Sequence, residues 1–287
     1  MKLNDNATLY FPEGRTEEEA FEVSQSGPLA IGAHQDDLEI FAMHGIGNAY
    51  LGNTPKFVGV TVTNGDGSPR KGEFANYTNE EMMAARLQEQ NEAAEIGRYG
   101  AQIQLGYKSG DIKGENPAKG IALLADIIEI LLELKPDTLY VHNPFDKHDT
   151  HLAITRATIK ALRALPEQER PKHVYGCEVW RGLDWVLSDQ KIALDVSPFL
   201  ELQEKLIDCH KSQIAGSKNY TQATIGRQLA NATYLGSHDL EEATAMTYAV
   251  DLMPLLKDKN LTMTEFARSH VNPFADKLIG KAKEYDV

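Results

Sequence analysis

Cysteine is scarce in this chain, with only Cys177 and Cys209 among 287 residues. Two cysteines cannot form a disulfide framework of the kind that holds small secreted domains together. They are also too few for a zinc site built from several thiolates. Both kinds of stabilisation are therefore excluded.

Basic residues are outnumbered, since 29 Lys and Arg stand against 42 Asp and Glu and the formal net charge is −13. Nucleic acids and anionic membranes are bound through cationic side chains that displace counterions, and this chain has no excess of them. We therefore expect neither nucleic acid nor an anionic membrane surface as a partner. The composition is otherwise that of a soluble globular protein, with 42% hydrophobic and 25% charged residues.

Long apolar runs are missing as well. No segment approaches the ~20 apolar residues that span a bilayer, and the first 27 residues lack the apolar core of a signal peptide. No G-x-G-x-x-G follows the first expected strand, which argues against a nucleotide cofactor. We expect a cytoplasmic protein with no membrane span.

Short apolar segments rich in β-branched residues alternate with longer segments of helical periodicity. The expected strands are residues 29–33, 56–63, 103–107, 138–142, 173–180 and 192–196. The expected helices are residues 38–51, 78–97, 116–134, 148–164, a segment starting at 197, 240–256 and 264–283. The capping box Thr78–Glu81 and the cap with first-turn proline at Asn116-Pro117 mark two of the helix starts. This alternation predicts a parallel α/β sheet. The simplest arrangement is a single domain over residues 1–287, with 1–27 as a surface extension and about 197–287 as helical additions.

The segment after the first expected strand carries one imidazole and two adjacent carboxylates, those of His34, Asp36 and Asp37. In open α/β sheets, ligands bind outside the carboxyl ends of the strands. His34 and Asp37 are three residues apart and can turn toward one cation, which leaves Asp36 free for another role. A pair of adjacent aspartates is by itself more often a helix cap or a solvated turn.

A second cluster, from His142 to His151, also follows a buried strand, so we expect both clusters at the same edge of the sheet. His148 and His151 are spaced i, i+3 and would share one face of a helix. Such a pair alone is usually two surface histidines, but the clusters together offer His34, Asp37 and His151 as ligands. Two imidazoles and one carboxylate, with an open position for water, form a catalytic zinc site.

The remaining polar side chains then have chemical roles. Zinc lowers the pKa of a bound water from about 15.7 to about 7, and Asp36 could take the proton of that water as a general base. His148, across the metal, could be protonated, stabilise the oxyanion of a tetrahedral intermediate and pass a proton to the leaving amine. Asp146 or Asp149 could hold that imidazole in the required tautomer. This chemistry is metal-assisted hydrolysis of an amide or ester.

These residues resemble the motifs of the PIG-L or LmbE-like zinc deacetylases, which remove acetyl from N-acetylglucosaminyl groups. The family's A-H-P-D-D motif with a following acidic residue reads here as Ala33–Glu39, and its H-x-D-H motif as His148–His151. The resemblance implies a Rossmann-like, mostly parallel sheet with helices on both faces. It also implies one zinc ion per chain, with the same ligand, base and oxyanion roles that the chemistry assigns.

Weaker similarities to the family extend over most of the chain. They are found in the loop 63–67, the helical segment 86–97, the pair 110–111 and the segment 205–213. In the family an arginine and an acid at these places help hold the sugar, so the resemblance makes Arg86 and Asp111 the substrate-binding candidates. A salt bridge on a helix face and a loop cap are the alternative explanations for these two residues.

Three positions depart from the family pattern. Gln35 replaces the proline of the first motif, Thr150 replaces the aspartate before the last ligand, and Met43-His44-Gly45 replaces a glycine pair. Because of Thr150, the carboxylate that orients the histidines must come from Asp146 or Asp149, or be absent. These changes bear on the substrate more than on the metal.

The function expected from these residues is metal-dependent removal of acetyl from an N-acetylated amino sugar or its glycoside, a small-molecule substrate. Two alternatives stay open. A non-haem Fe(II) enzyme could use the same two-histidine, one-carboxylate ligands, and a non-catalytic sugar-binding relative could keep the fold. The C-terminal amphipathic helix could cover its own core or that of a neighbouring copy, so a homo-oligomer is also open.

Overall fold

The computed structural model describes residues 1–216, 219–236 and 242–286. Within them, the strands are Thr8–Tyr10 (β1), Pro28–Gly32 (β2), Val58–Thr63 (β3), Ala101–Tyr107 (β4), Thr138–His142 (β5), His173–Cys177 (β6), Ile192–Asp195 (β7) and Met246–Asp251 (β8). They form one sheet in the order β1-β4-β3-β2-β5-β6-β8-β7. Strands β4, β3, β2, β5 and β6 run parallel, whereas β1, β8 and β7 run antiparallel to their neighbours.

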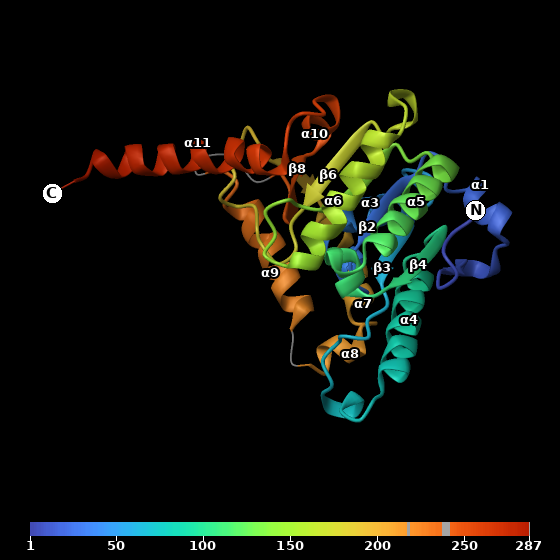
Figure 1. Cartoon of the computed structure of the whole chain (residues 1–287). Coiled ribbons are helices and arrows are strands. Elements are labelled where there is room, and N and C mark those ends of the chain that lie inside the picture. Colours follow the sequence, from blue (N-terminus) through green and yellow to red (C-terminus); the bar gives the residue numbers. More distant parts are fainter. Residues whose placement is uncertain (217–218, 237–241, 287) are drawn as a thin grey trace.

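Helices lie on both faces of this sheet (Figure 1). The α-helices are Glu17–Glu22 (α1), Asp37–Phe41 (α2), Met43–Tyr50 (α3), Asn79–Ile96 (α4), Pro117–Leu134 (α5), Asp149–Ala164 (α6), Leu200–Ile207 (α7), Lys211–Ile214 (α8), Tyr220–Thr233 (α9), Met253–Lys257 (α10) and Met263–Lys283 (α11). The predicted fold, a mostly parallel α/β sheet with helices on both faces, is confirmed.

The order of the strands reverses next to β2. From β2 the chain adds β3 and then β4 on one side, and it then crosses back to place β5 on the other side of β2. At such a reversal the connections leave the two strands in opposite directions, which opens a crevice at their carboxyl ends. The register pairs Ile31 with Val141. The residues that follow β2 and those that follow β5 therefore start side by side at this crevice.

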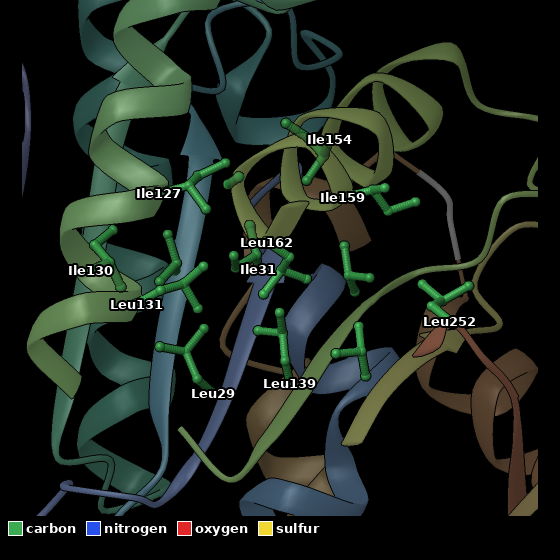
Figure 2. Packing of buried hydrophobic residues seen from close by; sticks show 14 of the residues in the cluster. Leu29, Ile31, Ile127, Ile130, Leu131, Leu139, Ile154, Ile159, Leu162 and Leu252 are labelled. Atoms are coloured by element: carbon green, nitrogen blue, oxygen red, sulfur yellow. The ribbon is translucent and has the colours of Figure 1, made fainter. Parts of the chain in front are cut away.

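Two helices and the central strands form the core on one face of the sheet, as Figure 2 shows. The side chains involved include Ile127, Ile130 and Leu131 of α5, Ile154, Ile159 and Leu162 of α6, and Leu29, Ile31 and Leu139 of the strands. Because strand side chains alternate, Ala30 and Tyr140 lie on the other face, in the core that α2, α3 and α7 complete. Burial of both faces explains why these strands are continuously apolar.

Helix starts predicted from capping residues are confirmed at two places. Thr78 Oγ1 accepts the N–H of Glu81, and the Glu81 carboxylate accepts the N–H of Thr78, which completes the capping box before α4. Asn116 caps α5, and Pro117 occupies its first turn. Strand β5 also has the predicted bounds.

Three predicted segments differ in the structure. The helix expected over 38–51 is interrupted at Ala42, which separates α2 from α3. Of the helix expected over 240–256, residues 240–241 lie outside the described residues, and Met246–Asp251 is strand β8 because it pairs with β6 on one side and β7 on the other. Residues 1–27, expected as a surface extension, contribute β1 to the sheet edge and also form α1.

Helix α11 extends away from the body of the molecule (Figure 1). Its buried side chains, Phe266 and His270, lie in its first half. Farther along, Leu278 and Ile279 are 58% and 54% exposed. Neither α11 nor any other helix in the described part of the chain has the length and apolar character needed to cross a membrane.

The two faces of α5 provide a test of this packing. Ile130 is fully buried in the core, whereas Ile121 on the same helix is 71% exposed. We expect Ile130→Ala to lower the free energy of unfolding by about 2–5 kcal/mol, because it leaves a cavity. Ile121→Ala should change it by less than about 0.5 kcal/mol. Denaturant titration measures both, and equal losses would contradict the assigned faces of α5.

Candidate active site

The turn after β2 shapes the first half of the site. Asp36 there has φ +96°, a left-handed conformation that costs a non-glycine residue about 1–3 kcal/mol. The Asp36 N–H donates to Gln90 Oε1 (3.3 Å), and the His34 N–H donates to Asp37 Oδ2 (2.7 Å). These bonds hold the turn in place, and His34, Asp36 and Asp37 all line the same cleft.

The structure brings the three predicted ligands together. His34 Nδ1 lies 3.2 Å from Asp37 Oδ2 and 3.3 Å from His151 Nε2, and His151 Nε2 lies 3.4 Å from Asp37 Oδ1. Ligand atoms at about 2.0–2.1 Å around a tetrahedral zinc ion are ~3.3–3.4 Å from one another. The chemistry of these donors fits such an ion. His34 faces Oδ2 of Asp37 and His151 faces Oδ1, and these distances are short enough for the three residues to share one ion.

Asp37 is the charged member of this set. Burial alone would raise its pKa, since the residue is 2% exposed. The neighbouring His151 and His142 imidazoles, together with the hydrogen bonding between Asp37 and His34, outweigh burial and hold the pKa of Asp37 well below its usual range. Asp37 is therefore ionised, as a carboxylate ligand must be.

The second half of the site depends on Asp146. Its Oδ2 lies 3.4 Å from His151 Nδ1 and accepts the N–H of Trp180 (3.2 Å), while its Oδ1 accepts the N–H of His148 (3.2 Å). A proton on Nδ1 of His151, facing this carboxylate, leaves the lone pair on Nε2 for a metal. Of the two predicted orienting carboxylates, Asp146 occupies this place, whereas Asp149 has an exposed side chain.

His142 also lies at the site, although the sequence motifs predict no role for it. Its Nε2 lies 3.4 Å from Asp37 Oδ2, and its ring stacks on that of His151 at 3.8 Å between centroids. Asp37, His142 and His151 could offer a second ligand set, but Nε2 of His142 already accepts the N–H of Ala33 (2.9 Å). Burial, and then the neighbouring His151, lower the pKa of His142 to about 4. In the sequence, His142 is the last residue of the strand expected over 138–142, and this position at the sheet edge indicates that it lies near the site.

His148 lies against the imidazoles of His34 and His151. Its ring stacks on His151 at 4.6 Å and meets His34 edge-on at 4.9 Å, and these three residues have ligand atoms within 4.8 Å of one another. Burial, followed by His151 and His34, lowers the pKa of His148 to about 4. This shift favours the neutral form of the His148 imidazole, which lines the cleft.

Asp36 lies beside the ligand set and is paired with a buried arginine. Its Oδ2 is 3.5 Å from Arg86 Nη2, and Arg86 also donates to the carbonyl of Gln35 and lies 3.7 Å from Glu89 Oε2. Burial raises the pKa of Asp36, while Arg86 opposes that shift. Arg86, predicted to bind substrate, lines the cleft but is only 1% exposed.

Segments distant in the sequence support this turn from behind. Glu89 of α4 accepts hydrogen bonds from the N–H and the hydroxyl of Ser212 in α8, both at 2.7 Å. Glu39 of α2 accepts hydrogen bonds from Gln90 and Tyr99, both at 2.8 Å, and lies 3.2 Å from His210 Nε2. The two segments with weak family similarity, 86–97 and 205–213, thus contact each other and the first motif.

A cleft of about 320 Å³ lies over the donor atoms. His148, Arg86 and the glycine-rich loop from Gly65 to Pro69 are among the groups that line it. Asp111, the second predicted substrate-binding residue, lines an adjoining cavity of about 480 Å³ that shares Thr63 with the cleft. The structure thus places Asp111 next to the cleft over the donors and not within it.

Comparison with protein families identifies the part of the chain that holds both motifs. Residues 29–162 match the PIG-L family model, described as GlcNAc-PI de-N-acetylase. No curated protein matches the chain. The matched segment runs from β2 almost to the end of α6 and contains His34, Asp37 and His151. The family resemblance expected from the motifs is therefore confirmed.

Solved structures with the same fold have low sequence identity to this chain. N,N'-diacetylchitobiose deacetylase from Pyrococcus horikoshii is 18% identical, with a TM-score of 0.59 over 83% of this chain and 94% of that one. The 4-carboxy-2-hydroxymuconate hydratase GalB from Pseudomonas putida KT2440 is 18% identical, with a TM-score of 0.56 over 79% and 96%. The A40926 pseudoaglycone deacetylase is 15% identical, with a TM-score of 0.58 over 79% and 97%. The hydratase among them illustrates that one fold can carry more than one reaction.

The donor geometry leads to a prediction about metal binding. We expect zinc to bind at one site per chain, and His151→Ala to weaken it by more than ~100-fold, which exceeds the 10–100-fold typical of losing an outer partner of a ligand. His173→Ala, which removes an exposed histidine, is the matched control and should bind zinc normally. Calorimetric titration of metal-free protein measures both affinities. Equal affinities for the two variants would contradict the assignment of His151.

Proposed function

Because residues 29–162 match the PIG-L family model, we propose that the protein is a metal-dependent hydrolase that removes acetyl from an N-acetylated amino sugar or its glycoside. The observation that carries the proposal is the set of donor atoms from His34, Asp37 and His151, which lie 3.2–3.4 Å apart where the strand order reverses. The family match and the deacetylases among the structural neighbours support the same class of reaction.

Zinc is the metal that we propose for this site. A catalytic zinc site has three protein ligands and an open position for water, and His34, Asp37 and His151 supply such a set. Fe(II) enzymes can use the same donors. When bound, zinc would lower the pKa of a coordinated water to about 7 and polarise the amide carbonyl. Elemental analysis of the purified protein distinguishes zinc from iron.

The residues around the donors divide the remaining chemistry among them. Asp36 takes a proton from the attacking water, because its carboxylate lies beside Asp37 and is not needed as a ligand. His148 donates its N–H to the oxyanion that develops on the carbonyl oxygen. The proton held by Asp36 then passes to the amine nitrogen as the C–N bond breaks, which leaves a free amine and acetate. Asp146 keeps His151 in the tautomer that binds the metal.

Arg86 and Asp111, the two predicted substrate-binding residues, are proposed to act in different ways. Arg86 lines the cleft and positions Asp36, so we propose that it acts chiefly through that carboxylate. Asp111 would be reached by a sugar or aglycone that extends from the cleft into the adjoining cavity. The partner that we propose is a small-molecule amino sugar, and location in the cytoplasm stays a prediction from the sequence.

Acetate release tests the proposed reaction. We expect the purified protein to release acetate from at least one member of a panel of N-acetylglucosamine conjugates, because the donors, the base and the cleft are all present. A chelator should abolish the release, and added zinc should restore it. Activity that a chelator does not affect would contradict the metal-dependent mechanism, and failure on the whole panel would contradict the substrate class.

Replacing the proposed base separates chemistry from metal binding. Asn tolerates the left-handed backbone of position 36, so Asp36→Asn removes the carboxylate and keeps the turn. We expect turnover to fall by about 10²–10⁴-fold, while the zinc content stays at that of the wild type. Asp189→Asn, at an exposed aspartate, is the matched control. Full activity of Asp36→Asn would show that another group takes the proton.

A further inference from the structure

The space around the donor atoms divides into two lobes that meet at Asp36 and Asp37. The first is the cleft of about 320 Å³ described above, and the second is a smaller space of about 190 Å³. Asp36, Asp37, Trp180 and Tyr220 line both of them. We call the smaller space the apolar lobe; its apolar lining comes from Ile40, Val179, Trp180, Tyr220 and Ala223.

Contacts with the core and with neighbouring side chains hold the walls of the apolar lobe in place. Ile40 and Val179 are 9% and 7% exposed, so the part of the wall that they form is packed into the core. The rings of Trp180 and Tyr220 meet edge-on at 6.1 Å. The backbone N–H of Trp180 donates to Asp146, the carboxylate that orients His151, and this bond ties the lobe to the metal-binding residues.

Polar side chains also border the apolar lobe, and one of them is engaged elsewhere. Asn219, Thr224 and Arg227 complete its lining. Arg227 donates through Nη1 to the backbone carbonyl of Val179. Part of its hydrogen-bonding capacity is thus used to fix the wall. The larger cleft differs in character, because Ser68, Ser109, Lys113 and Gln213 all line it.

This arrangement matches the two substituents of a scissile amide. The carbonyl carbon must lie next to the base Asp36 and the ligand Asp37, at the junction of the lobes. One substituent of that carbon is the amine, which carries the sugar, and sugar hydroxyls need the hydrogen-bonding partners that the larger cleft offers. The other substituent is the acyl chain, which needs apolar surroundings. The apolar lobe therefore lies where the acyl chain would extend.

We propose that the apolar lobe is an acyl subsite and that the preferred substrate carries an N-acyl chain of about four to six carbons instead of acetyl. This inference rests on the proposed function. A volume of 190 Å³ corresponds to roughly six times the ~30 Å³ share of a water molecule. An acetyl group with its carbonyl carbon at the junction would place only a methyl group in the lobe and leave most of it to water. The reaction is unchanged: water adds, the amide C–N bond breaks, and the products are the free amine and an alkanoate.

Chain-length dependence tests the proposal. We expect kcat/KM to rise from N-acetyl- to N-butanoyl- to N-hexanoylglucosamine, by roughly fourfold for each methylene that becomes buried and thus by about 15-fold for butanoyl over acetyl. Titration with the product anions gives a readout without turnover. Hexanoate should change the tryptophan fluorescence at concentrations more than about tenfold lower than acetate does, because Trp180 lines the lobe.

A variant that fills the lobe provides the matched comparison. Ala223 lines the lobe from the exposed side of α9, so Ala223→Phe adds a ring there without disturbing the core. We expect it to lower the ratio of kcat/KM for N-hexanoyl over N-acetyl substrate by tenfold or more. Ala230→Phe, on an exposed position of the same helix that does not line the lobe, should leave this ratio unchanged.

The outcomes separate this proposal from the proposed function. Hydrolysis of N-acetylglucosamine with little or no activity on the longer chains would overturn the acyl subsite and leave the deacetylase intact. An equal effect of Ala223→Phe and Ala230→Phe on the substrate ratio would also overturn it. Failure to hydrolyse any of the three amides in the presence of zinc would overturn both proposals together.

Discussion

The carboxylate of Asp37 is the group on which the site depends. It accepts the N–H of His34 within its own turn (2.7 Å), lies 3.4 Å from His151 Nε2 at the start of α6, and lies 3.4 Å from His142 Nε2 at the end of β5. One buried anion thus links the two segments that the strand-order reversal brings side by side. His142 Nε2 also accepts the N–H of Ala33, so its ring connects the end of β5 to the residue that follows β2.

Buried charged side chains at the site have partners that come from distant segments of the chain. Arg86 lies between the carboxylates of Asp36 and Glu89, and Ser212 satisfies Glu89 from a segment more than a hundred residues later. A buried charge that loses its partner is costly, so such a network must be complete or absent. The helices that follow the family-matched segment therefore contribute to the candidate site, because α8 supplies Ser212 and α9 supplies Tyr220.

The departures from the family pattern have local explanations in the structure. Gln35, in place of proline, ties the strained turn to the sheet through its side-chain amide, which donates to the Thr63 carbonyl (3.0 Å) and to Gln104 Oε1 (3.2 Å). Thr150 is buried at the cleft, and Asp146 supplies the carboxylate that position 150 lacks. His44 places its Nδ1 2.8 Å from the hydroxyl of Tyr140, on the opposite face of the sheet from α5 and α6.

The sequence by itself determined the alternation of strands and helices, the caps at Thr78 and Asn116, and the two motifs, because these follow from local periodicity, capping chemistry and residue type. It could not determine that Met246–Asp251 is a strand, because its β conformation comes from pairing with β6 and β7. Nor could it choose between Asp146 and Asp149, or assign a role to His142. Those choices depend on which atoms from distant segments meet in the crevice, and only the tertiary structure decides that.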